Sequence, residues 1–301
     1  MKVRIRLILE ALAALAVLLA AVPAQALLLA TDWSNRVWRI DPATGAILGE
    51  FASTPTHLVF DIAYRAADDT ILLGGNGRVT TVNRAGIQVS PPTFRLGARP
   101  FDMEIGPDGR LYSMDDQIVH INDPATGTAT GLFVEGVPTT LNCCTASEGG
   151  FEFNAQGELV LAGRDRLERR STAGALLFSI GLGFNSQSID LEILPNGELL
   201  IADSSYVIRY DVNLNALGGF TIPGPEFRDM ELSPTGDLLV VTDSEFLRFN
   251  PITGRLLVEE VTSIGFRDLE FIPDVAQAPE PASLALLGLA LAGLGWSRRR
   301  N

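Results

Sequence analysis

Short runs of apolar residues, interrupted by polar positions and bounded by Pro, Gly, Asn and Asp, occupy most of the chain. The segment Arg228–Gly254 shows this pattern most clearly. Its runs Asp229–Leu232, Leu238–Asp243 and Glu245–Phe249 are separated by turn-forming residues, and the last is followed by Asn-Pro-Ile-Thr-Gly. Runs of this length and composition are typical of β-strands joined by tight turns. Together with the next run, Arg255–Glu260, the segment predicts a meander of about four strands.

The same unit recurs along the chain. Aligning each copy on its first strand and the turn that follows gives six starts, namely Asp61, Asp102, Gly150, Asp190, Asp229 and Asp268. The starts lie roughly 40 residues apart, which is the period of a four-stranded propeller blade. A longer interval before Gly150 predicts an insertion between two blades at Gly136–Gly149.

The sixth copy ends after its first strand, at about Pro273, and its missing strands are found near the other end of the chain. Leu27–Asp32, Arg36–Asp41 and Ala46–Phe51 match the second, third and fourth strands of the unit. A ring closed by strands from both ends leaves no open sheet edge at the joint. The sequence therefore predicts an all-β, six-bladed β-propeller of four-stranded blades over residues 27–276.

Turn sequences at the same phase of their units support this alignment. Asp41–Gly45, Asp123–Gly127 and Asn250–Gly254 each begin with Asp or Asn, continue with Pro and end with Gly. Asp or Asn opens a turn, Pro presets the next φ, and Gly accepts the backbone geometry that follows. We assign these turns a structural role.

With these repeats, residues 27–276 resemble the β-propeller superfamily in the style of NHL and other SMP30-like six-bladed proteins. The Gly-His and Trp-Asp dipeptides of WD40 repeats are absent from the sequence. The resemblance implies an architecture and leaves the function open, because unrelated functions share such folds.

Residues 1–26 have the features of a secretory signal peptide. Lys2, Arg4 and Arg6 precede a Leu/Ala-rich apolar run, and the segment ends in Ala24-Gln-Ala26. A charged start, an apolar core and an A-x-A site predict export and cleavage after Ala26. A retained membrane anchor is the alternative, for which the apolar run is short.

Residues 277–301 contain three elements in order: Pro279-Glu280-Pro281, an apolar run from Ala282 to Trp296, and the basic cluster Arg298-Arg299-Arg300. This arrangement resembles a PEP-CTERM sorting signal. The resemblance implies recognition by an exosortase, processing near the Pro-Glu-Pro motif, and a bacterium that makes extracellular polysaccharide.

The apolar run before the basic cluster is short for a membrane span. As a helix it would extend about 22 Å, against a hydrocarbon core of about 30 Å. We therefore expect a transient membrane anchor, with Arg298–Arg300 holding the C-terminus on the cytoplasmic side and the propeller outside. A permanent tail anchor is the alternative.

The chain is strongly acidic, with a formal net charge of −13. The two terminal segments hold more basic than acidic residues, so the predicted propeller is more acidic than the whole chain. Such a body is repelled by phosphate backbones and anionic membranes. We therefore expect no nucleic-acid partner, and favour cations or neutral ligands such as sugars.

Carboxylates recur in the first strand of nearly every unit, with Asp at the first position and Glu at the third. Residues two apart share a face of a strand, so innermost first strands would direct these side chains into the central channel. Calcium, a hard ion with several oxygen ligands, would suit such a cluster. The candidate metal ligands are Asp102, Glu104, Glu152, Asp190, Glu192, Asp229, Glu231, Asp268 and Glu270, and Asp61 holds the first position of the first unit.

A structural role explains the same carboxylates without a cation. Each would accept hydrogen bonds from a neighbouring blade, and Arg228 and Arg267 directly precede two of the aspartates. A catalytic site needs asymmetry, whereas packing repeats. Recurrence in nearly every blade therefore favours the structural role.

Other catalytic groups are sparse. The only histidines are His57, in a loop before a unit, and His120, in a predicted strand, and no G-x-S-x-G or P-loop motif occurs. Gly74–Gly77 opens no helix and is interpreted as a tight turn, and the propeller region has no lysine for Schiff-base chemistry. The adjacent Cys143 and Cys144 could form a strained vicinal disulfide, pair between chains or stay as thiols.

Together these features predict a non-enzymatic, exported protein of the cell surface or extracellular matrix, whose propeller binds a glycan, a protein or an ion. One alternative, implied by the resemblance to SMP30-like proteins, is a calcium-dependent hydrolase or lactonase that uses the channel carboxylates. Another is a scaffold that presents rim loops, including Gly136–Gly149, to other proteins.

Overall fold

The computed structural model describes residues 26–55, 57–89, 94–95, 102–115, 118–123, 129–135, 150–163, 166–182, 190–203, 205–224 and 227–273. The chain divides into two units, one formed by Leu27–Ile272 and the other by Met1–Ala26 together with Pro273–Asn301. Of the second unit only Ala26 and Pro273 are described. The predicted signal peptide and sorting segment therefore lie outside the described residues.

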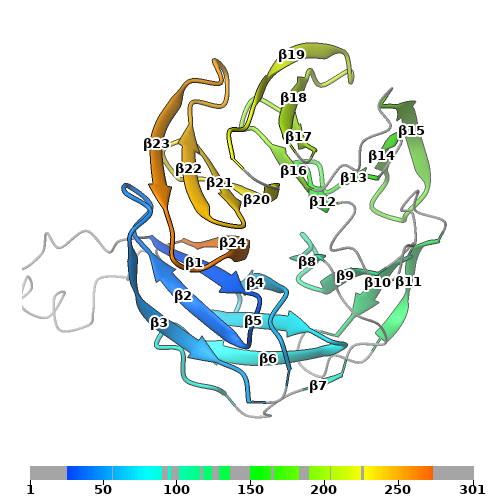
Figure 1. Cartoon of the computed structure of the whole chain (residues 1–301). Helices are drawn as coiled ribbons and strands as arrows, with labels where there is room; N and C mark the ends of the chain where they lie inside the picture. Colours follow the sequence, from blue (N-terminus) through cyan, green and yellow to red (C-terminus); the bar gives the residue numbers. More distant parts are fainter. Residues whose placement is uncertain are drawn as a thin grey trace, which may run out of the picture. The chain divides into compact units, whose positions relative to one another are not determined.

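In the described part of the chain, 24 strands form six four-stranded antiparallel sheets, arranged around a centre like the blades of a propeller (Figure 1). Blade 1 consists of β4 (Asp61–Arg65), β5 (Thr70–Gly75), β6 (Arg78–Asn83) and β7 (Phe94–Arg95). Blade 2 consists of β8 (Asp102–Ile105), β9 (Leu111–Asp115), β10 (Ile118–Asn122) and β11 (Ala129–Glu135). Blade 3 consists of β12 (Gly150–Phe153), β13 (Leu159–Ala162), β14 (Arg166–Arg170) and β15 (Leu176–Gly181). Blade 4 consists of β16 (Asp190–Ile193), β17 (Leu199–Ala202), β18 (Tyr206–Tyr210) and β19 (Ala216–Thr221). Blade 5 consists of β20 (Phe227–Leu232), β21 (Leu238–Thr242), β22 (Glu245–Phe249) and β23 (Leu256–Val261). Blade 6 consists of β24 (Phe266–Ile272), β1 (Leu27–Asp32), β2 (Arg36–Ile40) and β3 (Ile47–Ser53).

The first strand of each blade is the innermost one. β4, β8, β12, β16, β20 and β24 contact one another in this order, and β24 contacts β4, so these six inner strands close a ring. Every start identified in the sequence lies at or near the beginning of an inner strand. The predicted six-bladed architecture and the alignment of the repeats are confirmed.

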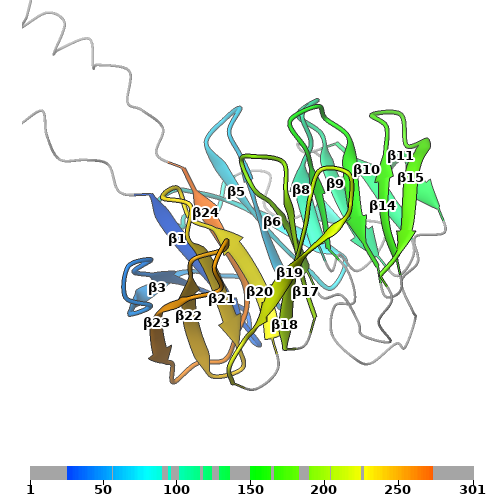
Figure 2. The same ribbon diagram turned by 90° about the horizontal axis from the view of Figure 1, so that it is seen from above.

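Blade 6 joins the two ends of the propeller. β24 pairs antiparallel with β1, so that Leu28 lies opposite Phe271 and Ala30 opposite Leu269. β2 and β3 complete the sheet, and Figures 1 and 2 show the blue β1 beside the orange β24. The predicted closure by strands from both ends is confirmed, and the joint consists of ordinary sheet hydrogen bonds.

The hydrophobic core lies between neighbouring blades. The second strands β5, β13, β17 and β21 are buried along their whole length. One core cluster joins Leu200 and Val207 of blade 4 to Val240 and Phe249 of blade 5. A continuous apolar run is typical of a strand that is covered on both faces, which explains the runs seen at these positions in the sequence.

The turns that end in Gly45 and Gly254 pack one blade against the preceding one. The N–H of Gly254 donates to Asn250 O at 2.9 Å, and its φ of 66° is left-handed. A Cβ at Gly254 would lie 2.4 Å from the Cβ of Phe220, and one at Gly45 would lie 2.4 Å from the ring of Phe246. Glycine is needed here both for the backbone conformation and for the close approach.

Arginine side chains on the third strands reinforce the same contacts. Arg209 Nη1 donates to Ile252 O at 2.7 Å, and Arg248 Nη1 donates to Ala43 O at 3.1 Å. Each guanidinium also forms an ion pair with an acidic residue of its own blade. The turns are thereby fixed to the preceding blade by charge-assisted hydrogen bonds as well as by packing.

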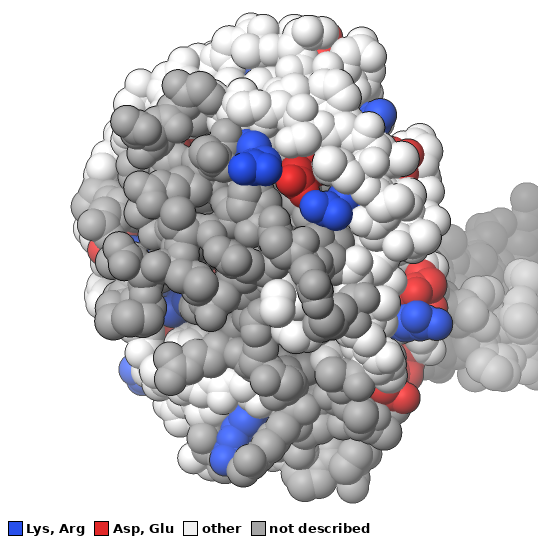
Figure 3. Space-filling model, turned by 90° about the vertical axis from the view of Figure 1, so that its right-hand side faces the viewer, with Lys and Arg blue, Asp and Glu red and all other residues white. Residues whose placement is uncertain are grey.

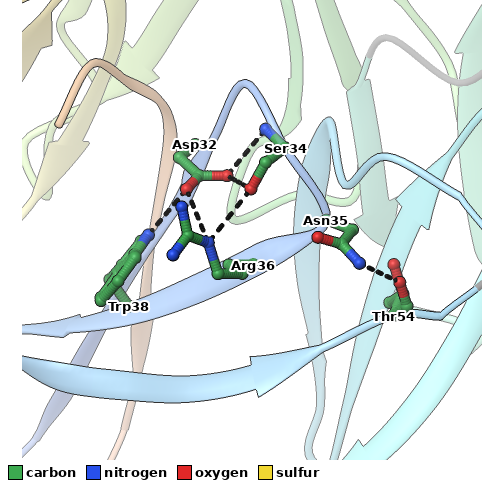
Figure 4. Close-up of polar contacts among 6 residues, drawn as sticks. All are labelled: Asp32, Ser34, Asn35, Arg36, Trp38 and Thr54. Carbon is green, nitrogen blue, oxygen red and sulfur yellow. Dashed lines mark hydrogen bonds and ion pairs between the residues drawn. The ribbon is translucent and has the colours of Figure 1, made fainter.

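The turn between β1 and β2 is held by side chains of its own residues (Figure 4). The carboxylate of Asp32 accepts the Ser34 N–H at 2.7 Å and the indole N–H of Trp38 at 3.0 Å. Asn35 Nδ2 donates to Thr54 O at 2.7 Å. These bonds connect the turn to the end of β3 and so order the closing blade.

The glycine-rich segment Gly74–Gly77 forms the turn between β5 and β6. Asn76 and Gly77 have φ values of 49° and 71°, as a two-residue hairpin turn requires. A strand follows this turn, so there is no helix N-terminus to bind a phosphate. The interpretation as a tight turn is confirmed.

Replacing Gly254 with alanine tests the packing between blades. Gly254→Ala should lower the free energy of unfolding by about 2–4 kcal/mol, because a left-handed backbone and an overlap with Phe220 both oppose the methyl group. Urea unfolding measures this loss. Gly236→Ala is the matched control, since Gly236 has a φ of 83° but no atom within 4 Å of its Cβ position. We expect about 1 kcal/mol for the control, and equal losses would show that the contact with Phe220 contributes nothing.

Candidate functional site

The inner strands surround a central cavity of about 200 Å³ that is lined almost entirely by carboxylates. Side chains two apart on each inner strand point the same way, as the sequence predicted for innermost first strands. We call the ten acidic residues that line this cavity the channel carboxylates. They are Asp61, Asp102, Glu104, Glu152, Asp190, Glu192, Asp229, Glu231, Asp268 and Glu270.

Channel aspartates accept hydrogen bonds from the backbone of the next blade. The bonds are Phe151 N–H to Asp102 at 2.7 Å, Met230 N–H to Asp190 at 2.9 Å, and Leu269 N–H to Asp229 at 2.7 Å. Each carboxylate therefore forms a directional link between two sheets that share no strand pairing. This arrangement agrees with the structural role weighed for these residues in the sequence.

Channel glutamates repeat the pattern one step further along each inner strand. The bonds are Ile193 N–H to Glu152 at 2.6 Å, Leu232 N–H to Glu192 at 3.2 Å, and Phe271 N–H to Glu231 at 3.4 Å. The Asp and Glu positions thus each contribute to joining a blade to the next.

Burial raises the pKa values of the channel carboxylates. Loss of solvent is the main cause in every case, and neighbouring carboxylates add to it. The pKa rises to about 8 for Asp61 and Glu231, to about 7 for Glu104 and to about 6 for Asp190. The backbone N–H donors act in the opposite direction, because they stabilise the ionised form.

Two positions interrupt the regular pattern. Gly150 stands where the other inner strands have aspartate, and a Cβ there would lie 2.8 Å from the Asp190 carboxylate. The Leu191 N–H is instead bonded at 2.8 Å by Asp190 itself. Ala63 stands where the other inner strands have glutamate. The carboxylates are therefore not equivalent around the channel.

The carboxylates do not form a preassembled metal site. Among the described residues, no three His, Cys, Asp or Glu side chains are placed to hold one metal ion. The predicted ligands are brought together around the cavity, but their oxygens are directed largely at backbone N–H groups of the next blade. The calcium-dependent hydrolase suggested by the resemblance would need a fuller ligand set, and we derive no catalytic step through such an ion.

Two guanidinium groups and two aromatic rings lie close together beside the channel aspartates Asp268 and Asp61. The guanidinium carbons of Arg228 and Arg267 each lie 4.9 Å from the centroid of the Trp33 ring, and that of Arg267 lies 4.0 Å from the centroid of Phe60. Arg228 also donates to both carboxylate oxygens of Asp243, at 2.6 and 2.9 Å. Burial lowers the pKa of Arg267 to about 10. The sequence pointed to the two arginines but not to their aromatic partners.

Neither histidine is among the residues that line the central cavity. His57 is buried, and its Nε2 lies 3.3 Å from Leu73 O. Burial lowers the pKa of the His57 ring. His120 lies on β10 opposite Ser113 of β9.

A second cavity, which we call the inter-blade cleft, lies between blades 3 and 4 and has a volume of about 490 Å³. Its polar lining includes Asn154, Gln156 and Asn196 from the turns after the two inner strands. Its apolar lining includes Val212 and Leu214 from the turn after β18. The cleft forms where turns of different blades meet, so no single stretch of sequence indicated it.

The remaining sequence predictions fall outside the described residues. These are the insertion with Cys143 and Cys144, the cleavage site at Ala24, the Pro-Glu-Pro motif and the C-terminal arginines. In the part of the chain that is described, no helix has the length and apolarity needed to cross a bilayer. On the face drawn in Figure 3, the basic side chains of the described residues are scattered and form no continuous patch.

Residues 277–300 match the PEP-CTERM protein-sorting motif. This match confirms the assignment made from the Pro-Glu-Pro motif, the apolar run and the basic cluster. The motif indicates an exported protein that is directed to the cell surface and, in general, processing by an exosortase. Among curated proteins no match to the chain was found.

Solved structures share the propeller fold. A protein of unknown function from Bacteroides caccae is 13% identical over 83% of this chain and 100% of its own, with a TM-score of 0.62. The WD40 β-propeller domain of Doa1 is 11% identical over 79% and 80%, with a TM-score of 0.59. A chain of the nidogen/laminin complex is 10% identical over 81% and 97%, with a TM-score of 0.64. At such identities the likeness concerns the fold alone.

Stability should fall as the pH rises. A carboxyl whose pKa is raised by folding is protonated in the folded state at pH values where the unfolded chain has already lost the proton. Its contribution is complete below its ordinary pKa of about 4 and is lost as the pH rises toward about 8, the folded pKa of Asp61 and Glu231. With a chelator present, we expect the free energy of unfolding to fall by up to about 1.4 kcal/mol per pH unit for each such carboxyl.

Urea unfolding between about pH 4 and about pH 8 measures this slope. Glu231→Gln should reduce it, because the amide oxygen still accepts the Phe271 N–H but does not titrate. Glu259→Gln on the exposed strand β23 should leave the slope unchanged. A free energy of unfolding that rises over this range would contradict the assignment of raised pKa values.

Proposed function

We propose that this protein is a non-enzymatic binding propeller of the extracellular polysaccharide layer, and that it engages neutral glycan chains through the inter-blade cleft. The observation that carries the proposal is the sorting motif at residues 277–300, which directs the protein to the surface. The C-terminal apolar run would hold the protein in the membrane until exosortase processing near Pro279-Glu280-Pro281.

The use of the channel carboxylates supports a binding role. Six of their hydrogen bonds to the next blade are described, with distances from 2.6 to 3.4 Å. An acid that accepts a backbone N–H in the ground state is engaged in holding the blades together. A propeller built in this way presents its binding groups on its surface, where turns and loops of rigid blades meet.

The acidic charge of the chain supports a neutral ligand. With a formal net charge of −13, the protein repels polyanions at low ionic strength. Neutral sugars bind through hydroxyl groups and through the apolar faces of their rings. They therefore experience no long-range repulsion from this body.

The lining of the inter-blade cleft has the chemistry that such a ligand needs. The amides of Gln156 and Asn196 offer donors and acceptors for hydroxyl groups, while the exposed Val212 offers an apolar contact. Leu214 has a left-handed φ of 64°, which is uncommon for residues other than glycine and aspartate or asparagine. Such backbone strain is found preferentially at ligand sites.

Removal of the sorting segment tests the surface role. Deleting residues 277–301 should release the propeller from the cell surface into the medium, because the signal for exosortase recognition is lost. Fractionation and immunoblotting of producing cells measure the distribution. Replacing Arg298–Arg300 alone is the matched comparison, and it should retain the export of the propeller while slowing processing.

Mass spectrometry of the surface protein distinguishes processing from permanent anchoring. We expect mature protein that ends near Pro279-Glu280-Pro281 and lacks Trp296. Mature protein that retains Trp296 would contradict processing. An unchanged distribution after the deletion would contradict sorting through this segment.

Substitutions in the cleft test glycan binding. Gln156→Ala and Val212→Asp should each weaken retention of the protein in a gel that contains the neutral polysaccharide of the producing cells. Combined in one protein, the two changes should weaken binding by about tenfold, which corresponds to about 1.4 kcal/mol. Gln88→Ala, an exposed glutamine of blade 1, is the matched control and should bind like the unmodified protein. Unaltered retention of both cleft variants would overturn the assignment of this cleft.

A further inference from the structure

The outer edge of blade 3 carries an exposed apolar strand. β15 is the last strand of its sheet, and within the described part of the chain no strand pairs with its outer side (Figure 1). Leu176 is 53% exposed, Leu177 is 48% exposed and Phe178 is 39% exposed. An edge strand directs N–H and C=O groups away from its sheet, and these groups can pair with the strand of another chain. Such a strand would also cover the apolar side chains.

Most other outer strands of the propeller carry charge. Glu259 of β23 lies opposite Leu247 in the register in which Ser179 of β15 lies opposite Glu168. β3, β7 and β11 each contain a charged residue as well. Charged side chains on an edge strand oppose its pairing with another chain. β19 has no charge, but two glycines at its centre leave a partner strand little to contact. β15 therefore combines an unprotected edge with large apolar side chains.

Blade 3 is also neutral in an acidic chain. Residues 150–189 contain four acidic and four basic residues, whereas the whole chain has a formal net charge of −13. From Ser171 to Ile189 the sequence has no charged residue. Two copies of the chain carry like net charges and repel each other, and this repulsion is smallest where uncharged segments meet. A second copy can therefore approach through blade 3 at the least electrostatic cost.

The side chains of β15 are self-complementary in an antiparallel pair. If Ser179 lies on a two-fold axis, Phe178 of each copy lies opposite Ile180 of the other, and Leu177 lies opposite Gly181. Aromatic and β-branched residues are favourable cross-strand neighbours, and the symmetry forms each contact twice. A strand of another protein would have to match this pattern, whereas a second copy supplies it without further requirement.

From these observations we propose that the protein forms a symmetric dimer in which β15 pairs antiparallel with β15 of a second copy. The pairing joins two four-stranded blades into one continuous sheet and satisfies the free backbone groups of both edges. One strand pair is a small interface, so the dimer forms at high protein concentration and dissociates on dilution. This inference does not rest on glycan binding.

A cysteine at the centre of the pair tests its register. In the mature protein with Cys143 and Cys144 replaced by serine, Ser179→Cys should form a disulfide-linked dimer under mild oxidation. Opposite residues of an antiparallel pair have Cα atoms about 4.5–5.5 Å apart, which suits a disulfide. Glu259→Cys, at the corresponding exposed position of β23, is the matched control and should stay monomeric on a non-reducing gel. Equal cross-linking of the two variants, or none at position 179, would overturn the proposal.

Reversible association gives an independent readout. Sedimentation of the unmodified mature protein, purified from the producing cells, should show a monomer–dimer equilibrium. Dimerisation should strengthen as salt is added, because salt screens the repulsion between two acidic bodies. A monomer at every concentration, whether the edge is free or covered by a strand of another protein, would overturn the proposal.

Charged variants locate the contact. Phe178→Lys should weaken dimerisation by at least about tenfold, because it removes the contact with Ile180 twice and brings two like charges to the axis. Val261→Lys, which adds the same charge at an exposed position of β23, should leave dimerisation unchanged. If Phe178→Lys does not fold, Leu177→Lys gives the same comparison from the opposite face of the strand. Equal losses in the β15 and β23 variants would contradict pairing through β15.

Discussion

Hydrogen bonds from backbone N–H groups of one inner strand to carboxylates of the preceding one hold the six sheets in register around the axis. Neighbouring blades share no strand pairing, and the apolar surface between them is non-directional. Bonds such as Leu269 N–H to Asp229 and Ile193 N–H to Glu152 supply the direction that packing lacks. Because these bonds need an acid at the joints, ten acidic side chains are gathered around the channel, where burial raises their pKa values.

Much of this architecture could be predicted because each blade carries its own local signals. Strand and turn residues recur with a fixed period, and the match of Leu27–Asp32 to a second strand was sufficient to predict the pairing of β1 with β24. The direction of Asp229 and its equivalents also followed from the two-residue period of a strand. These inferences rest on chemistry that lies within one repeat.

Features made by two blades together could not be predicted in the same way. The inter-blade cleft depends on how the turns at Asn154 and Asn196 meet, and the stacking of Arg267 on Phe60 joins residues of blades 6 and 1. A repeat fixes what each blade presents, whereas the angle and offset between two blades decide which groups meet.

The pairing of β1 with β24 also sets the order in which the protein can fold. With residues 1–26 acting as the signal peptide that the sequence predicts, β1, β2 and β3 would reach the outside first, and their sheet would have a free edge until β24 arrives. β24 ends at Ile272, only a few residues before the sorting motif begins at residue 277. On that prediction, the last strand needed for a complete fold would also be the last part of the body to be exported, and closure of the ring would wait until the sorting segment has been reached.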